Sequence, residues 1–218
     1  MYYCPNSPET IAHIRAKHKI HFEGKALSVD EFEKESGVFY LPFSRYRSIK
    51  SYHRIVRQCK RLVNLDAVER ESLWLGTYHA KELNSAWVQP MHIRWVSEEL
   101  GYGAFASRPI RSGAFIGEYV GLVKWYAPFD LNSNAYCFRC PSAPYYWIRY
   151  TIDAQNYGNE IRYIKHSNTP NCESRGVCLN DFFHVCLFAM RDIPAGEQLC
   201  YDYGKFSEGT RKKLVPIP

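Results

Sequence analysis

Glycine and proline interrupt the second half of the chain at short intervals. They stand at Gly101, Gly103, Gly113, Gly117, Gly121, Pro128, Pro141, Pro144, Pro194 and Gly196. Between them lie apolar and aromatic runs at 92–96, 104–106, 114–122, 135–139, 145–153, 182–190 and 198–201. This spacing leaves no room for a long helix and favours short strands joined by turns. We therefore expect a mainly β domain (α+β) of several small sheets, with one or two helical turns at 159–165.

The first 90 residues show helical periodicity instead. Apolar or aromatic side chains recur at helical spacing between residues 45 and 63, at Ile49, Tyr52, Val56, Cys59 and Val63. Asp66, with Glu69 three residues later, predicts the cap of a second helix that reaches Leu83. We expect a helical N-terminal region at 1–90, the main domain at 91–207 and a tail at 208–218.

Positive charge is concentrated in the first of these helices. The chain has a net charge of +6, and residues 45–61 hold seven lysines and arginines and no acidic residue. Such a face suits nucleic acid or another acidic surface. A solvated helix face packed on the second helix would explain it equally well.

The cysteines predict neither a metal site nor disulfides. Among the eight, only Cys137 and Cys140 have metal-like spacing, and no second pair completes a tetrahedral site. We expect reduced thiols in a cytosol-like compartment. The N-terminus shows no basic segment followed by an apolar one, so no classical signal peptide is expected. The sequence contains no run of 18 uncharged apolar residues, which a membrane-spanning helix would need, and no membrane contact is expected.

Common catalytic motifs are missing, and the residues near Gly204 are the most informative. The sequence has no GxSxG, no HExxH and no phosphate-binding GxxxxGK[ST]. Tyr201 and Tyr203 flank Asp202 at the end of an expected strand, and side chains two apart on a strand share a face. Two interpretations stay open here: an aromatic cluster closing a core, or an aromatic slot for a cation or alkylammonium chain.

Six segments taken in order carry a family resemblance. They are GYGAFA (101–106), GEYVG (117–121), AYCF (135–138), YTIDAQNYGN (150–159), RYIKHSNTPN (162–171) and IPAGEQLCYDYG (193–204). This series resembles the SET domain of protein lysine methyltransferases over about 110 residues, from Gly101 to Gly204. The short chain also looks like the stand-alone SET proteins of intracellular bacteria, which act on host chromatin.

The resemblance implies a fold, a cofactor and roles for named residues. The fold would be the SET fold, with a knot-like crossing of segment 162–171 and the YDYG strand, fixed by Asn171. The cofactor would be S-adenosylmethionine. Cofactor-binding positions would be Gly101, Tyr102, Gly103, Arg162, Lys165 and His166. Tyr203 and Tyr136 match the catalytic and second channel tyrosines, Tyr201 and Phe206 would contact the substrate lysine, and no metal is required.

Two positions define what is particular to this chain. Tyr201 stands where the family has Phe or Tyr, and its hydroxyl predicts mono- or dimethylation. Lys165 replaces the asparagine usual in the family. It could pair with the cofactor carboxylate while repelling its sulfonium, or turn outward and contact the cofactor through its backbone alone.

The resemblance leads to two functional hypotheses. In the first, the protein methylates a lysine of a protein, with a histone tail as the expected substrate and a nucleic acid contact through 45–61. In the alternative, a catalytically weak SET-like scaffold binds nucleic acid or chromatin through its basic helix. Either would act in the cytoplasm, or in a host nucleus after secretion.

Overall fold

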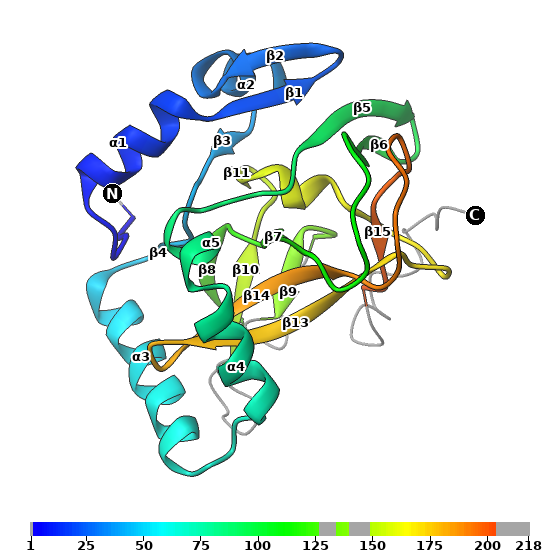
Figure 1. The fold of residues 1–218 in the computed structure, drawn as a ribbon. Helices are drawn as coiled ribbons and strands as arrows, with labels where there is room; N and C mark the ends of the chain where they lie inside the picture. Colours follow the sequence, from blue (N-terminus) through cyan, green and yellow to red (C-terminus); the bar gives the residue numbers. More distant parts are fainter. Residues whose placement is uncertain (1, 127–133, 140–148, 204–218) are drawn as a thin grey trace.

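The computed structural model describes residues 2–126, 134–139 and 149–203 (Figure 1). Within these ranges the helices are α1 (Pro8–Lys17), α2 (Val29–Ser36), α3 (Ile49–Asn64), α4 (Arg70–Tyr78), α5 (Ala80–Asn84) and the 3-10 helix η1 (Glu160–Tyr163). The strands of the first half are β1 (Lys19–Phe22), β2 (Lys25–Ser28), β3 (Phe39–Tyr40), β4 (Arg45–Tyr46), β5 (Met91–Ser97) and β6 (Gly101–Ala106). Those of the second half are β7 (Phe115–Glu118), β8 (Leu122–Tyr126), β9 (Cys137–Arg139), β10 (Arg149–Asp153), β11 (Tyr157–Gly158), β12 (Lys165–His166), β13 (Cys172–Leu179), β14 (Phe182–Ala189) and β15 (Cys200–Tyr201).

The described strands form four small sheets, as the glycine and proline spacing predicted. Their orders are β2-β1-β5-β6, β4-β8-β10-β9, β11-β3 and β12-β15-β13-β14-β7. The longest hairpin, β13–β14, runs between α3 and α4 (Figure 1). Strand β13 was not predicted, because its sequence CESRGVCL carries polar side chains and a glycine where a core strand would alternate.

The segment before residue 91 contains helices α1 to α5, in line with the expected helical region, but it is not helical throughout. Besides helices it contributes β1 to β4, and each of these strands lies in a sheet with a partner strand. Strand β1 pairs with β5, and β4 pairs with β8, so strands from both sides of residue 90 share sheets. The placement of a domain boundary at residue 90 stays a prediction.

Helix α3 confirms the predicted helix but buries a different stripe. Its core side chains are Ile55, Cys59 and Leu62, whereas Ile49 in the first turn is 50% exposed. The buried positions keep the helical spacing of three and four residues. Of these three, only Cys59 also belongs to the predicted stripe. The basic residues Arg47, Lys50, Arg54, Arg57, Lys60 and Arg61 are exposed on or beside this helix.

The predicted cap at Asp66 is wrong. Asp66 has a φ of 51° in the turn after α3, and the next helix begins at Arg70. Gly76 brings α4 against β13, because a Cβ there would overlap the carbonyl of Cys178. Ser72 adds a hydrogen bond, its Oγ donating to the carbonyl of Gly176 at 2.7 Å. The helix then breaks near His79, and α5 ends at Asn84.

Candidate active site

Aromatic rings gather around β15 at the end of the described chain. The ring centroids of Tyr201 and Tyr203 lie 4.6 Å apart, and Tyr201 stacks on Phe138 at 6.1 Å. Burial raises the pKa of Tyr203, and the nearby Tyr136 raises it further, although Arg162 opposes this. Burial likewise raises the pKa of Tyr201 well above its ordinary value. Both phenols are therefore neutral at physiological pH and can act as hydrogen-bonding groups but not as bases.

Tyr203 is held at both its backbone and its hydroxyl. Its hydroxyl donates to the carbonyl of Ile164 at 3.1 Å, and its backbone N–H donates to Nδ1 of His166 at 3.2 Å. Because Nδ1 accepts a hydrogen bond, the proton of a neutral His166 lies on Nε2. His166, which is buried, thus positions the tyrosine.

The crossing predicted for segment 162–171 is formed by parallel pairing. Strand β12 pairs with β15, Lys165 opposite Cys200 and His166 opposite Tyr201. Asn171 joins the two segments: its Nδ2 donates to the carbonyl of Gln198 at 2.8 Å, and its Oδ1 accepts from the N–H of Cys200 at 2.9 Å. This buried amide explains how the short strand β15 keeps its place, and confirms that Asn171 holds the crossing.

Two cations lie beside the tyrosines. The buried guanidinium of Arg162 donates to the carbonyls of Ala154 and Gln155 at 2.7 and 2.8 Å. It also lies over the ring of Tyr136, at 4.3 Å from the centroid. Nζ of Lys165 is 5.8 Å from the same centroid, and among the described residues it has no hydrogen-bond or ion-pair partner.

The surroundings of Lys165 lower its pKa to about 8. Burial is the main cause, and the positive charge of Arg162 adds to it. Near neutral pH the side chain still carries its charge, and it loses that charge within the mildly alkaline range. The site therefore contains an ammonium whose charge no carboxylate of the described chain balances.

The three residues predicted on β6 lie at the edge of this group. Tyr102 contacts Tyr163, the neighbour of Arg162, with centroids 6.3 Å apart. A Cβ at Gly103 would lie 2.5 Å from Nε2 of Gln198, so a larger residue would displace the Gln198 side chain. Gly101 has a φ of +67°, which also favours glycine.

Tyr136, Tyr201, Tyr203, Arg162, Lys165 and His166 thus lie in one group, to which Tyr102 is linked through Tyr163. Phe206 lies outside the described residues. Sequence reasoning missed Tyr119 and Phe138. The hydroxyl of Tyr119 donates to the carbonyl of Tyr136 at 2.6 Å, and its ring lies 5.4 Å from that of Phe138. Their positions in the quoted GEYVG and AYCF segments were the available signal.

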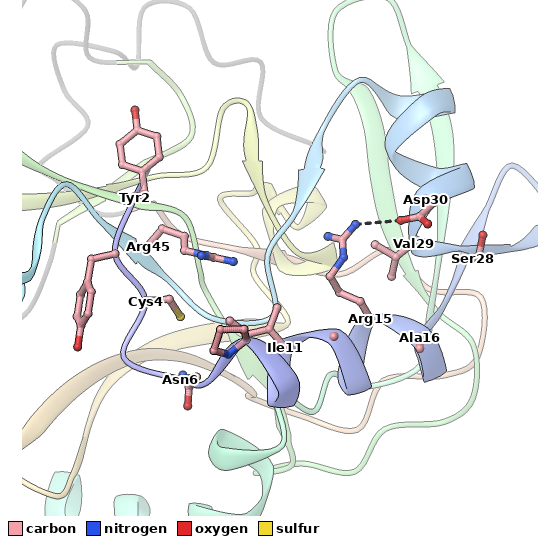
Figure 2. Close-up of a pocket in the computed structure, with 13 residues that line it drawn as sticks. Tyr2, Cys4, Asn6, Ile11, Arg15, Ala16, Ser28, Val29, Asp30 and Arg45 are labelled. Carbon is pink, nitrogen blue, oxygen red and sulfur yellow. Dashed lines mark hydrogen bonds and ion pairs between the residues drawn. The ribbon is translucent and has the colours of Figure 1, made fainter.

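A cavity of the described chain lies away from this site. It has a volume of about 890 Å³ and is bounded by the N-terminal segment, α1 and the start of α2 (Figure 2). Arg15 and Arg45 both line it, and Arg15 is paired with Asp30 across it at 3.0 Å (Figure 2). None of the tyrosines described above lines this cavity, so volume alone does not locate the chemistry.

The described ranges contain neither a candidate metal site nor a disulfide. No group of three or more His, Cys, Asp and Glu side chains there could hold a metal ion. The seven cysteines described are free thiols, and Cys140 falls outside. Within the same ranges, no helix has the length and apolar character needed to cross a membrane.

Comparison with known families decides the fold. The model of the SET domain family matches residues 101–204, which contain the tyrosines, the two cations and the crossing. Residues 101–204 have the SET domain fold. This confirms the mainly β SET fold expected from the sequence.

Known proteins resemble about half of this chain. The variant-silencing SET domain-containing protein of Plasmodium falciparum (isolate 3D7) is 34% identical over 114 residues, which is 49% of this chain and 4% of that protein. The histone H3-lysine(4) N-trimethyltransferase ATX1 of Arabidopsis thaliana is 36% identical over 115 residues, 51% of this chain and 11% of ATX1. The chain therefore spans only a small part of the length of these relatives.

A solved structure gives a partial match. The crystal structure of KRYPTONITE in complex with mCHH DNA, an H3(1-15) peptide and SAH is 26% identical in sequence, with a TM-score of 0.46. The match covers 56% of this chain and 25% of that one.

Proposed function

We propose that this protein transfers a methyl group from S-adenosylmethionine to a lysine side chain of a protein, with a histone as the expected substrate. The observation that carries the proposal is the fixed phenol of Tyr203. It is bonded to Ile164 and His166 and packed against Tyr201, within the SET domain. The relatives named for histone lysine methylation support the same activity.

The donor groups beside the tyrosines fit one end of this cofactor. Lys165 offers an ammonium without a hydrogen-bonded or ionic partner among the described residues. It can pair with the carboxylate of the cofactor, while its charge repels the sulfonium and the ammonium. The guanidinium of Arg162 is already bonded to two carbonyls and so holds the wall in place. When bound, the cofactor would supply a methyl group on a sulfonium. Tyr102, Lys165 and His166 would lie along it, as the resemblance predicts.

The protein's own contribution would be positional and electrostatic. A substrate lysine has an ordinary pKa of ~10.4, so removing its proton at pH ~7.4 costs about 4 kcal/mol. The buried ring of Tyr201 and the partly buried rings of Tyr203 and Phe138 disfavour a charged amine and so reduce that cost. The phenol oxygen of Tyr203 keeps lone pairs that can orient the amine, while the rings hold it in line.

Tyr201 would limit the number of methyl groups added. It is 4% exposed, and its ring packs against those of Phe138 and Tyr203. A hydroxyl in this position takes up space that a bulkier methylated amine would need. We therefore propose mono- or dimethylation, although the relative ATX1 is named a trimethyltransferase.

The activity is tested with labelled S-adenosylmethionine, the purified full chain, histones and whole-cell lysate. Label mapped by mass spectrometry to a lysine side chain supports the proposal. Label on another residue type, or none under any condition, would contradict it.

The alternative function rests on the basic face of α3. Arg47, Lys50 and Arg54 are exposed there, with no ion pair in the described part of the chain. Cations on one face attract phosphates and release counterions, so binding to duplex DNA should weaken as salt rises. Reversing these three charges should abolish DNA binding, whereas reversing Glu98, Glu99 and Asp30 should not. DNA binding without methyl transfer would favour the scaffold over the enzyme.

We further propose that the protein acts in a reducing compartment, the cytoplasm or a host nucleus. The described free thiols agree with this. The likeness to short bacterial SET proteins stays a prediction, since the relatives reported above come from a parasite and a plant. Cell fractionation with an epitope-tagged chain tests the compartment, and recovery only outside cells would contradict it.

A further inference from the structure

A second cavity, of about 210 Å³, lies where the N-terminal segment and α3 meet the β13–β14 hairpin. Six of its lining residues carry chemistry: Phe43, Tyr46, Tyr52, Glu118, Phe182 and His184. None of them was among the residues predicted for the site.

Three of the rings form walls at different angles. Tyr46 and Tyr52 are 4.9 Å apart with their planes at 66°, and Tyr46 and Phe182 are 6.3 Å apart at 82°. Phe182 also lies 5.9 Å from Tyr52. At these distances the three rings are in contact with one another, so a cation would lie against the ring surfaces that line the cavity and not between the rings.

Glu118 is the acidic residue among those lining the cavity. Oε1 of Glu118 lies at hydrogen-bonding distance, 2.8 Å, from Nδ1 of His184. Both side chains are largely buried. Its second oxygen, Oε2, has no hydrogen-bond partner in the described ranges. No lysine or arginine is among the residues lining the cavity. A carboxylate can accept several hydrogen bonds, so Glu118 retains unused capacity.

This cavity is separate from the tyrosine site although the two are one residue apart in sequence. Glu118 pairs with Cys186 at the edge of the sheet, so it shares a face with His184 and Phe182, two and four residues from Cys186. The next residue, Tyr119, points the other way and donates to the carbonyl of Tyr136. The sheet therefore separates two aromatic sites.

We propose that the cavity bounded by Tyr46, Tyr52, Phe182 and Glu118 is a binding site for an alkylammonium group. The volume admits a small organic cation, the rings attract its charge and its methyl groups, and Oε2 of Glu118 accepts an N–H. A partly methylated ammonium satisfies both kinds of partner. A dimethylammonium should thus bind more tightly than an unmethylated ammonium, which exposes few methyls to the rings, or a quaternary one, which has no N–H.

The first test compares choline with its uncharged isostere 3,3-dimethyl-1-butanol, titrated into the full chain and followed by NMR. Choline should bind about tenfold more tightly than the alcohol, because only the cation gains from the rings and the carboxylate. Glu118→Gln and Phe182→Leu should each weaken choline binding about fivefold or more. Equal binding of choline and alcohol, or full binding by both variants, would overturn the proposal.

Controls separate this cavity from other aromatic surfaces. Trp125→Leu changes an exposed ring on β8 and should leave choline binding unaltered. Loss of choline binding in Tyr203→Phe but not in Phe182→Leu would assign the ligand to the tyrosine site and overturn the proposal. Thermal unfolding verifies that each variant folds, and Tyr52→Leu replaces Glu118→Gln if that variant is unfolded.

Peptides distinguish the source of the ammonium. A short basic peptide is prepared with its lysine unmodified, dimethylated or trimethylated. Tightest binding of the dimethylated form, lost in Phe182→Leu, identifies a protein side chain as the ligand. Binding of choline with no difference among the peptides identifies a free small amine. Methyl transfer by the Phe182→Leu variant should remain at the wild-type rate, so failure here is distinct from failure of the proposed activity.

Discussion

The protein has two aromatic sites on opposite faces of one sheet, and they differ in how their polar groups are paired. In the tyrosine site, Tyr203 and Arg162 are bonded to backbone carbonyls of the chain itself. In the cavity beside α3, Glu118 has one histidine partner and an unused oxygen. The first site carries uncompensated positive charge at Lys165, whereas the residues lining the second include the acidic Glu118 and no lysine or arginine.

This difference separates a site built to hold geometry from one built to receive a ligand. Internal hydrogen bonds fix Tyr203 before any substrate arrives, which favours positional chemistry. An acceptor left open at the wall of a cavity gains its partner only on binding. Mutations in the tyrosine site should therefore mainly lower the stability of the fold, whereas mutations in the cavity beside α3 should mainly lower ligand affinity.

The largest effect is expected from Arg162→Met. The change removes two hydrogen bonds from a buried guanidinium and leaves the carbonyls of Ala154 and Gln155 without that donor. The free energy of unfolding should fall by about 3 kcal/mol, measured by urea denaturation. The matched control Arg175→Met removes exposed ion pairs and should cost less than about 1 kcal/mol. Equal losses would show that Arg162 does not hold the tyrosine site.

The pH dependence of stability should report on Lys165. Its folded pKa of about 8 lies below the ordinary 10.5, so between these values the unfolded chain binds more protons than the folded one. Stability contributed by this group must then rise with pH across that window. Relative to Lys165→Met, the wild type should gain on the order of 2 kcal/mol between pH 7.5 and 9.5. Lys60→Met, on the exposed face of α3, should show no such difference.

The charge of Lys165 should also affect cofactor affinity, by a smaller free energy than it affects stability. Lys165→Asn removes a cation that repels the sulfonium and the ammonium of S-adenosylmethionine, so binding should tighten by about fivefold at pH 7. Above pH 8 the wild-type lysine loses its proton, and the gap should narrow. Calorimetric titration of both proteins with the cofactor, at pH 7 and above pH 8, measures this difference in affinity. Weaker binding by Lys165→Asn would indicate that the ammonium holds the carboxylate more strongly than it repels the sulfonium.

The smallest expected change is in the methylation state of the product. Tyr201→Phe removes one hydroxyl from the buried cluster and should shift the product from mono- or dimethyllysine towards trimethyllysine, read by mass spectrometry. Trimethyllysine as the main wild-type product, unchanged in Tyr201→Phe, would refute the role of the hydroxyl. The overall rate should change little, because Tyr203 is untouched.

Local patterns in the sequence predicted the strands best where an apolar run between two turns corresponds to one paired strand. Runs of apolar residues between glycines gave most strands of the second half, since a strand in a small sheet is short and bounded by turns. Strand β13 was missed because its pairing with β14 depends on residues beyond it in the chain. Asp66 was misread as a cap because its left-handed conformation depends on how α3 ends.

The tyrosine site was predicted more completely than the cavity beside α3. Six site residues came from ordered motifs, and the structure brings these together. Tyr119 escaped notice because its role is a hydroxyl contact to a backbone carbonyl. The cavity lines up Tyr46 and Tyr52 with Phe182 from segments more than a hundred residues apart, and no local pattern marks such a meeting.

The proposed activity is tested most directly by the rate of methyl transfer from S-adenosylmethionine to a histone lysine in Tyr203→Phe. Loss of this hydroxyl removes the group that orients the amine, and the rate should fall about a hundredfold while the chain stays folded. Trp125→Phe, an exposed ring outside the site, should retain the wild-type rate. A Tyr203→Phe rate equal to that of wild type would contradict the central role given to this tyrosine.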